Sequence, residues 1–153
     1  MTSLFTLLPA AVTSIDVEGK DAILKHLAGL FAEVYELDGA HVLGALLERE
    51  QLGSTGFGRR IAIPHARVEG LKRPVSAFIR LESPAEFQSA DGLPVDLVFG
   101  LLSPQGAGAT HLHALAAISR MMRDERMHAT LVEATGPEAI YALLNNVLDR
   151  DAA

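Results

Sequence analysis

The sequence of 153 residues contains no cysteine and no tryptophan, and only 5% of its residues are aromatic. The absence of cysteine excludes disulfides, thiolate zinc sites and cysteine nucleophiles. Positive charge is also scarce, because 13 Lys and Arg face 19 Asp and Glu, and the formal net charge is -6. Nucleic-acid binding depends on a basic face that releases counterions, so this balance argues against a nucleic acid as partner.

The sequence also lacks a hydrophobic run long enough to cross a membrane. The apolar N-terminal stretch, residues 1–15, has no basic residue before Lys20 and is too short to span a bilayer. We expect it to be a strand or loop packed on the domain of a cytoplasmic protein, without direct membrane insertion. Since 49% of the residues are hydrophobic and no repeat or linker interrupts them, we expect one domain over 1–153, with its core at about 17–148.

Helical and strand patterns alternate along this domain. Apolar residues recur at helical spacing in 17–34, and Asp38 can cap a second helix that ends before Gly53. Thr110 can cap a third helix that runs through Met122, and 135–138 has the pattern of a capping box that opens a last helix reaching about 148.

Three segments between these helices have strand patterns. Residues 61–63 are a short apolar run ended by Pro64, which has no N–H for a ladder. Residues 75–82 alternate between apolar and polar side chains, and 95–102 is apolar enough to be buried on both faces. The alternation of helices and strands predicts an α/β fold, a single domain with a mixed β-sheet flanked by helices on both faces.

Positive charge is concentrated in the stretch GSTGFGRRIAIPHARVEG, residues 53–70. It carries three arginines (Arg59, Arg60 and Arg67) around His65, with no carboxylate between Gln51 and Val68. A local cationic pocket in an acidic chain suits a small anion such as phosphate.

The glycines of this stretch do not form a known nucleotide-binding motif. Gly53 and Gly58 have P-loop spacing, but two arginines and a strand follow where Lys, Ser or Thr and a helix are required. The dinucleotide fingerprint also fails, because Ile61 stands where its third glycine belongs. Ser54 and Thr55 are expected to be turn residues rather than nucleophiles.

His65 follows Pro64 at the end of the short strand, and ligands gather at the carboxyl ends of strands in open α/β sheets. A cationic environment lowers the pKa of a histidine and leaves one ring nitrogen unprotonated as a nucleophile. A capping or surface histidine is the alternative.

The pair His111 and His113 resembles a metal-ligand doublet, but helical geometry separates the two rings. At roughly 100° per residue, His111 shares a face with Leu115 and Ile118, whereas His113 lies on the opposite face. The pair cannot bind one ion, which argues against a zinc hydrolase. Two converging neutral imidazoles, from His65 and His111, suit a phosphohistidine: one attacks phosphorus and the other donates to its oxygens. No function is expected for the remaining histidines: His26, His41 and His128.

Three segments carry a resemblance to a known family: LLEREQLGSTGFGRRIAIPHARVEG, PVDLVFGLLSP and THLHALAAISRMM. In the same order, over about 17–144, the chain resembles the IIA domains of the bacterial phosphoenolpyruvate-dependent phosphotransferase system. The similarity is to the fructose/mannitol type and, within it, to the nitrogen-regulatory branch. The run GSTG-x-G-x-x-IAIPH is its most specific part.

The resemblance implies a phosphotransferase component with a phosphohistidine intermediate. We expect no cofactor, and no metal, because the sequence offers no set of three converging metal ligands. It implies that His65 is phosphorylated on Nε2, that His111 stabilises the phosphoryl group and that Arg49 binds phosphate. The implied donor is the histidine phosphocarrier protein, and the other partners are regulatory targets or a IIB component. Two alternatives stay open: a sugar-specific IIA transport component, and a binding module without phosphotransfer. Weaker phosphate-binding candidates are Arg59, Arg60, Arg67, Ser54 and Thr55.

Transfer between two proteins favours a shallow exposed surface with an apolar rim over a deep pocket. Phe57 is a candidate for that rim, or equally a core residue.

Overall fold

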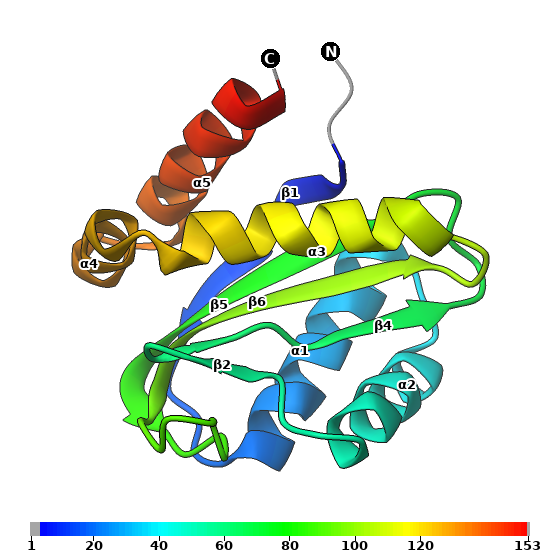
Figure 1. The fold of residues 1–153 in the computed structure, drawn as a ribbon, viewed down its shortest axis with the longest axis horizontal. Coiled ribbons are helices and arrows are strands. Elements are labelled where there is room, and N and C mark those ends of the chain that lie inside the picture. Colours follow the sequence, from blue (N-terminus) through cyan, green and yellow to red (C-terminus); the bar gives the residue numbers. More distant parts are fainter. Residues whose placement is uncertain (1–3, 153) are drawn as a thin grey trace.

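Six strands form one mixed sheet in the computed structural model, which describes residues 4–152, and helices cover both of its faces (Figure 1). The strand order is β1-β5-β6-β3-β2, and β4 also pairs with β6. The strands are β1 (Thr6–Ile15), β2 (Gly56–Gly58), β3 (Ile61–Ala62), β4 (His65–Val68), β5 (Val75–Ala85) and β6 (Val95–Pro104).

The strand β6 is the centre of this sheet. It runs antiparallel to β5 and parallel to both β3 and β4, while β1 at the edge is parallel to β5. Residues 95–103 of β6 are all buried, as predicted for a strand covered on both faces. Because β6 pairs along its whole length, its register fixes where each neighbouring segment begins and ends.

The helices lie on opposite faces of β6, as predicted. A side chain added at Gly100 would meet Leu27 and Phe31 of α1, whereas Ser103 contacts His111 of α3. Alternate residues of a strand point to opposite faces, so α1 and α3 cover different faces. The helices are α1 (Lys20–Tyr35), α2 (Gly39–Gln51), α3 (Gly108–Arg123), α4 (Glu125–Glu133) and α5 (Pro137–Ala152).

The predicted cap of the second helix is confirmed, and those of two later helices are wrong. The Asp38 carboxylate accepts hydrogen bonds from the N–H groups of Ala40 and His41 at the start of α2. Thr110 lies inside the first turn of α3, because the chain already turns at Gly108 and the Thr110 N–H donates to Ala107. The helix α5 begins at Pro137, and its Ile140 N–H donates to the carbonyl of Gly136, so Gly136 and not Thr135 occupies the cap position.

Pro64 interrupts its strand rather than ending it, which corrects the prediction. Ile63 and Pro64 separate β3 from β4, yet both segments pair with β6. Proline lacks a donor but keeps an acceptor, and its carbonyl receives the N–H of Leu101. His65 is consequently the first residue of the resumed strand.

Across residues 4–152, no helix combines the length and apolar character needed to span a membrane.

Candidate functional site

An open hollow lies where α2, β4 and the first turn of α3 meet, on the right of Figure 1. His65 and Arg67 reach it from β4, Arg49 from the last turn of α2, and His111 from α3. The structure therefore brings together four residues that the sequence identified as candidates, from three separate elements.

The hydrogen bonds of His65 fix which of its nitrogens carries the proton. Nδ1 lies 2.8 Å from the carbonyl oxygen of Ile63, and a carbonyl only accepts, so Nδ1 is the donor. The Arg49 Nε–H donates to Nε2 over 3.3 Å. The lone pair of Nε2 is thus held toward a positive charge at the hollow.

Arg49 is itself held in place by the end of its helix. Its Nη1 donates to the carbonyl of Gly53 over 2.8 Å, two residues beyond the end of α2. A basic side chain in the last turn of a helix also interacts favourably with the helix dipole. The guanidinium therefore bridges the end of α2 and the His65 ring.

His111 faces the body of the protein and His113 faces solvent, as the helical geometry predicts. The His111 residue is only 3% exposed, and its ring centroid lies 5.7 Å from that of His65 at an angle of 45°. Its Nδ1 is 2.7 Å from the Ser103 hydroxyl oxygen on β6. The sequence does not indicate this contact of Ser103, because the contact depends on the packing of α3 on β6.

Burial is the main reason that both imidazoles stay neutral. Desolvation lowers the pKa of His65, and the positive charges of Arg49 and Arg67 lower it further against the opposing hydrogen bond to Ile63. Desolvation, followed by the charges of Arg67 and His65, lowers the pKa of His111 to about 4. The sequence-based prediction that the arginines cause this effect is therefore wrong in its emphasis, because their charges are the smaller cause.

Arg59 and Arg60 do not lie at this hollow, contrary to the sequence-based candidates. They form the two-residue turn between β2 and β3, with φ of 57° and 70°, at the end of the sheet beside α4 (left in Figure 1). There they line a second hollow with Arg123. The intervening β3 carries the chain across the sheet, so arginines that are neighbours of His65 in sequence are separated from it in space.

Ser54 and Thr55 hold the loop after α2, as expected of turn residues, and lie away from the hollow. The Ser54 hydroxyl donates to the Phe87 carbonyl and accepts from the Gly56 N–H. The backbone N–H and hydroxyl of Thr55 both donate to the Glu50 carboxylate. Their polar atoms are occupied within the fold, and neither residue lines the hollow.

Two exposed leucines give the hollow an apolar rim. Leu52, just past α2, is 83% exposed, and Leu112, beside His111, is 60% exposed. Phe57, the residue suggested from the sequence, is 40% exposed and belongs to neither this rim nor the buried core. The position of Leu112 follows from helical geometry: a residue next to one on the buried face points outward.

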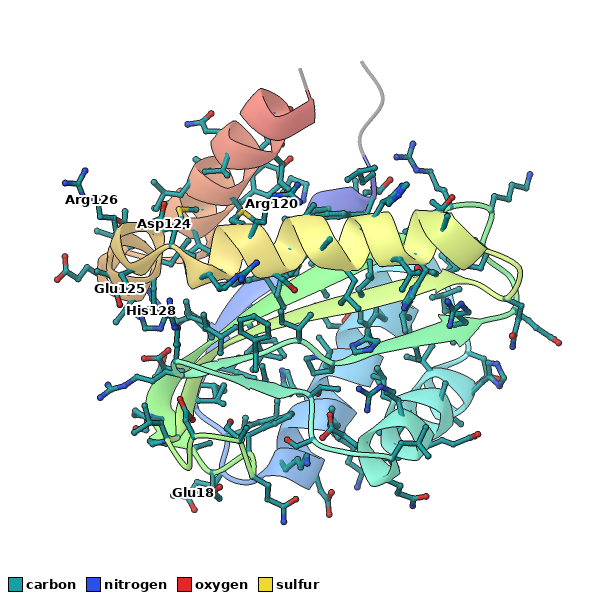
Figure 2. The ribbon with its side chains drawn as sticks, viewed as in Figure 1. Glu18, Arg120, Asp124, Glu125, Arg126 and His128 are labelled. Atoms are coloured by element: carbon teal, nitrogen blue, oxygen red, sulfur yellow. The ribbon has the colours of Figure 1, made fainter. Side chains whose placement is uncertain are left out.

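His128 has a structural partner that its polar sequence neighbourhood does not indicate. Figure 2 shows it on the side of α4 that faces the sheet, with Glu125 and Arg126 projecting outward. Its Nε2 lies 2.7 Å from the carboxylate of Asp96, which is buried in β6. The imidazole satisfies a carboxylate that would otherwise be buried without a partner.

Comparison with known proteins identifies the family. The profile described as "Phosphoenolpyruvate-dependent sugar phosphotransferase system, EIIA 2" matches residues 7–147. The chain belongs to this family. This family acts in phosphoryl transfer.

Several relatives of this EIIA domain are nitrogen regulatory proteins. The chain is 42% identical over 135 residues to the "Nitrogen regulatory protein" of Bradyrhizobium diazoefficiens, covering 88% of each chain. It is 41% identical over 129 residues to that of Pseudomonas aeruginosa, covering 84% of each. The crystal structure of nitrogen regulatory protein IIA-Ntr from Neisseria meningitidis superposes with a TM-score of 0.84 at 34% identity, over 90% of this chain and 95% of that one.

Proposed function

We propose that this protein is a phosphoryl carrier of the phosphoenolpyruvate-dependent phosphotransferase system, that it accepts the phosphoryl group on Nε2 of His65, and that it acts as a nitrogen-regulatory IIA signal. The observation that carries this proposal is the state of the His65 ring. Its proton is engaged by Ile63 on Nδ1, and its Nε2 lone pair is aimed at Arg49 in an open hollow.

The transfer step follows from this tautomer. The lone pair of His65 Nε2 attacks the phosphorus of a phosphohistidine on the donor, the histidine phosphocarrier protein. A new N–P bond forms at His65, the donor's N–P bond breaks, and that bond pair returns to the donor's ring nitrogen. The Nδ1 proton stays in its hydrogen bond to Ile63 throughout, so the ring does not have to rotate.

The surrounding charges favour the product. Phosphorylation adds about two negative charges, and the guanidinium groups of Arg49 and Arg67 lie in the same hollow. His111 supplies a neutral ring 5.7 Å away, centroid to centroid, within reach of a phosphoryl oxygen. Charge-assisted hydrogen bonds to these groups stabilise the transferred phosphoryl group without any metal.

A protein donor fits the outline of the hollow. Leu52 and Leu112 project from its two sides, and exposed leucines around a polar centre suit a surface that is covered only during docking. We place this exchange in the cytoplasm. A regulatory target, or a IIB component, would approach the same rim.

The regulatory output rests on the change in charge. The hollow is cationic when His65 is free and becomes near neutral or anionic when it carries phosphate. A target must bind one form better, since only differential affinity makes phosphorylation a signal. Calorimetric titration of a target with both forms should therefore give different Kd values, and equal values would leave a carrier without a switch.

The deciding experiment is phosphorylation in a reconstituted pathway. The protein is incubated with phosphoenolpyruvate, enzyme I and the phosphocarrier, and its intact mass is measured. We expect one added phosphoryl group, lost in His65→Ala and kept in the control His113→Ala, whose histidine is exposed on the far face of α3. Undiminished labelling of His65→Ala would contradict the proposal.

A further inference from the structure

We infer that Ser103 fixes the tautomer of His111, so that the His111 ring presents Nε2–H, a hydrogen-bond donor, to the phosphoryl group on His65. Ser103 is then a positioning residue that acts through His111. The role of Ser103 in phosphoryl transfer rests on the proposed function. The tautomer of His111 does not, because it is a property of the unphosphorylated protein.

The Ser103 hydroxyl has one hydrogen-bond partner, the Nδ1 atom of His111. Ser103 is fully buried on β6, and its oxygen lies 2.7 Å from Nδ1 of His111. This hydroxyl makes no other hydrogen bond among residues 4–152. A hydroxyl rotates to suit its surroundings, so it donates to Nδ1, because the reverse arrangement would bury its hydrogen without a partner.

A neutral imidazole that accepts at one nitrogen must carry its proton on the other. His111 is neutral at pH 7, since desolvation and the charges of Arg67 and His65 lower its pKa to about 4. Its proton therefore lies on Nε2.

The Nε2 atom is free to act on a group bound in the hollow. It has no hydrogen-bond partner among the described residues. The buried side-chain N and O atoms without a partner in this part of the chain are those of Thr13 and Ser89, so His111 Nε2 is not fully buried. Solvent therefore reaches it. His111 also lines the hollow that His65 shares, so Nε2–H is available to a phosphoryl oxygen there.

The two histidine rings are thus held in opposite tautomers by their hydrogen bonds. On His65, the Ile63 carbonyl holds the proton on Nδ1 and leaves Nε2 as the nucleophile. On His111, the Ser103 hydroxyl occupies Nδ1 and leaves Nε2 as the donor. Without Ser103 the neutral ring of His111 could expose a lone pair, which would repel the phosphoryl oxygens.

The test combines a tautomer measurement with a rate. Two-bond ¹H–¹⁵N spectra of ¹⁵N-histidine-labelled protein at pH 7 should show His111 protonated on Nε2, assigned by loss of the signal in His111→Ala. In Ser103→Ala the signals should shift toward a mixture of tautomers. Phosphorylation by the phosphocarrier should slow about five- to tenfold, the change that corresponds to one weakened hydrogen bond.

Two variants separate this role from a merely structural one. Ser76→Ala also removes a fully buried serine hydroxyl, one that donates to the Thr6 carbonyl, and should change neither tautomer nor rate. Ser103→Thr retains the hydroxyl and should restore Nε2–H. A proton on Nδ1 in the wild type, or an unchanged tautomer in Ser103→Ala, would overturn the inference. Absence of phosphorylation in the wild type would instead contradict the proposed function, and the tautomer result would stand.

Discussion

The Nε of Arg49 donates to Nε2 of His65 over 3.3 Å, so in the free protein a cation occupies the direction from which a phosphoryl group must arrive. Transfer requires this hydrogen bond to pass from the ring nitrogen to a phosphoryl oxygen. Arg49 can follow that exchange while its Nη1 remains on Gly53.

Replacement of Arg49 should therefore impair phosphorylation directly. We expect Arg49→Ala to slow the reaction about tenfold, since a charge-assisted hydrogen bond contributes roughly 1.5–3 kcal/mol and partial exposure reduces that value. Arg60→Ala is the matched control, because Arg60 lies in the other hollow. Rates from single-turnover phosphorylation decide the matter, and equal slowing by both variants would show that general positive charge, rather than position, is responsible.

The pH dependence of stability should report the buried His111. Its pKa of about 4 is below the ordinary value of 6.5, so between these values the unfolded chain binds the extra proton and the folded state loses stability as pH falls. This group should lower the free energy of unfolding by about 2 kcal/mol between pH 7 and pH 5. Denaturant unfolding at the two pH values should show a smaller loss in His111→Ala.

The His111→Ala variant should also fold, because alanine in a first helical turn costs little. Its phosphorylation should be slower than that of the wild type. A rate equal to the wild type would make His111 a structural residue only.

The apolar rim should matter for docking and not for folding. Leu112→Asp introduces a charge at a side chain that is 60% exposed, so the melting temperature should change little. The KM for the phosphocarrier should rise several-fold with a smaller effect on kcat, because a carboxylate replaces apolar contact area. Phe57→Asp is the control, since Phe57 is exposed away from the hollow. A similar rise in KM for this control would relocate the docking surface.

Chelators should leave the transfer from the already phosphorylated phosphocarrier to this protein, and the melting temperature of this protein, unchanged. Among residues 4–152, no three metal-ligating side chains lie together, and His111 and His113 face opposite sides of α3. Mass spectrometry of the protein purified without added metal checks this, and stoichiometric zinc would refute it. Enzyme I should be assayed separately, so that an effect of the chelator on that enzyme is not assigned here.

Two glycines allow a matched test of the packing between α1 and the sheet. A Cβ at Gly100 would lie 2.8 Å from a Leu27 methyl carbon and 3.0 Å from the Phe31 ring. Gly100→Ala should therefore destabilise the fold by about 1–3 kcal/mol through overpacking. Gly44 lies in α2 with open space around it, so Gly44→Ala should stabilise by about 0.5–1 kcal/mol. Thermal unfolding of both variants measures the difference in sign.

The sequence by itself indicated the main helices, the central strand β6 and the orientation of side chains within them, but not the starts of α3 and α5 or the strand β4 after Pro64. Helical periodicity placed His111 on the buried face of α3 and His113 on the exposed face, and the Asp38 cap marked the start of α2. These features depend on interactions within one or two turns, which are encoded locally. The resemblance of the motif around His65 to the IIA family pointed to the same residue.

Only the tertiary structure decided which residues share the hollow. Arg67 lies in it, whereas Arg59 and Arg60 do not, because the pairing of β3 and β4 with β6 sets their distance from His65. The contact of Ser103 with His111 depends in the same way on how α3 packs across the sheet. Strand register and helix packing join residues far apart in sequence, and no local pattern contains that information.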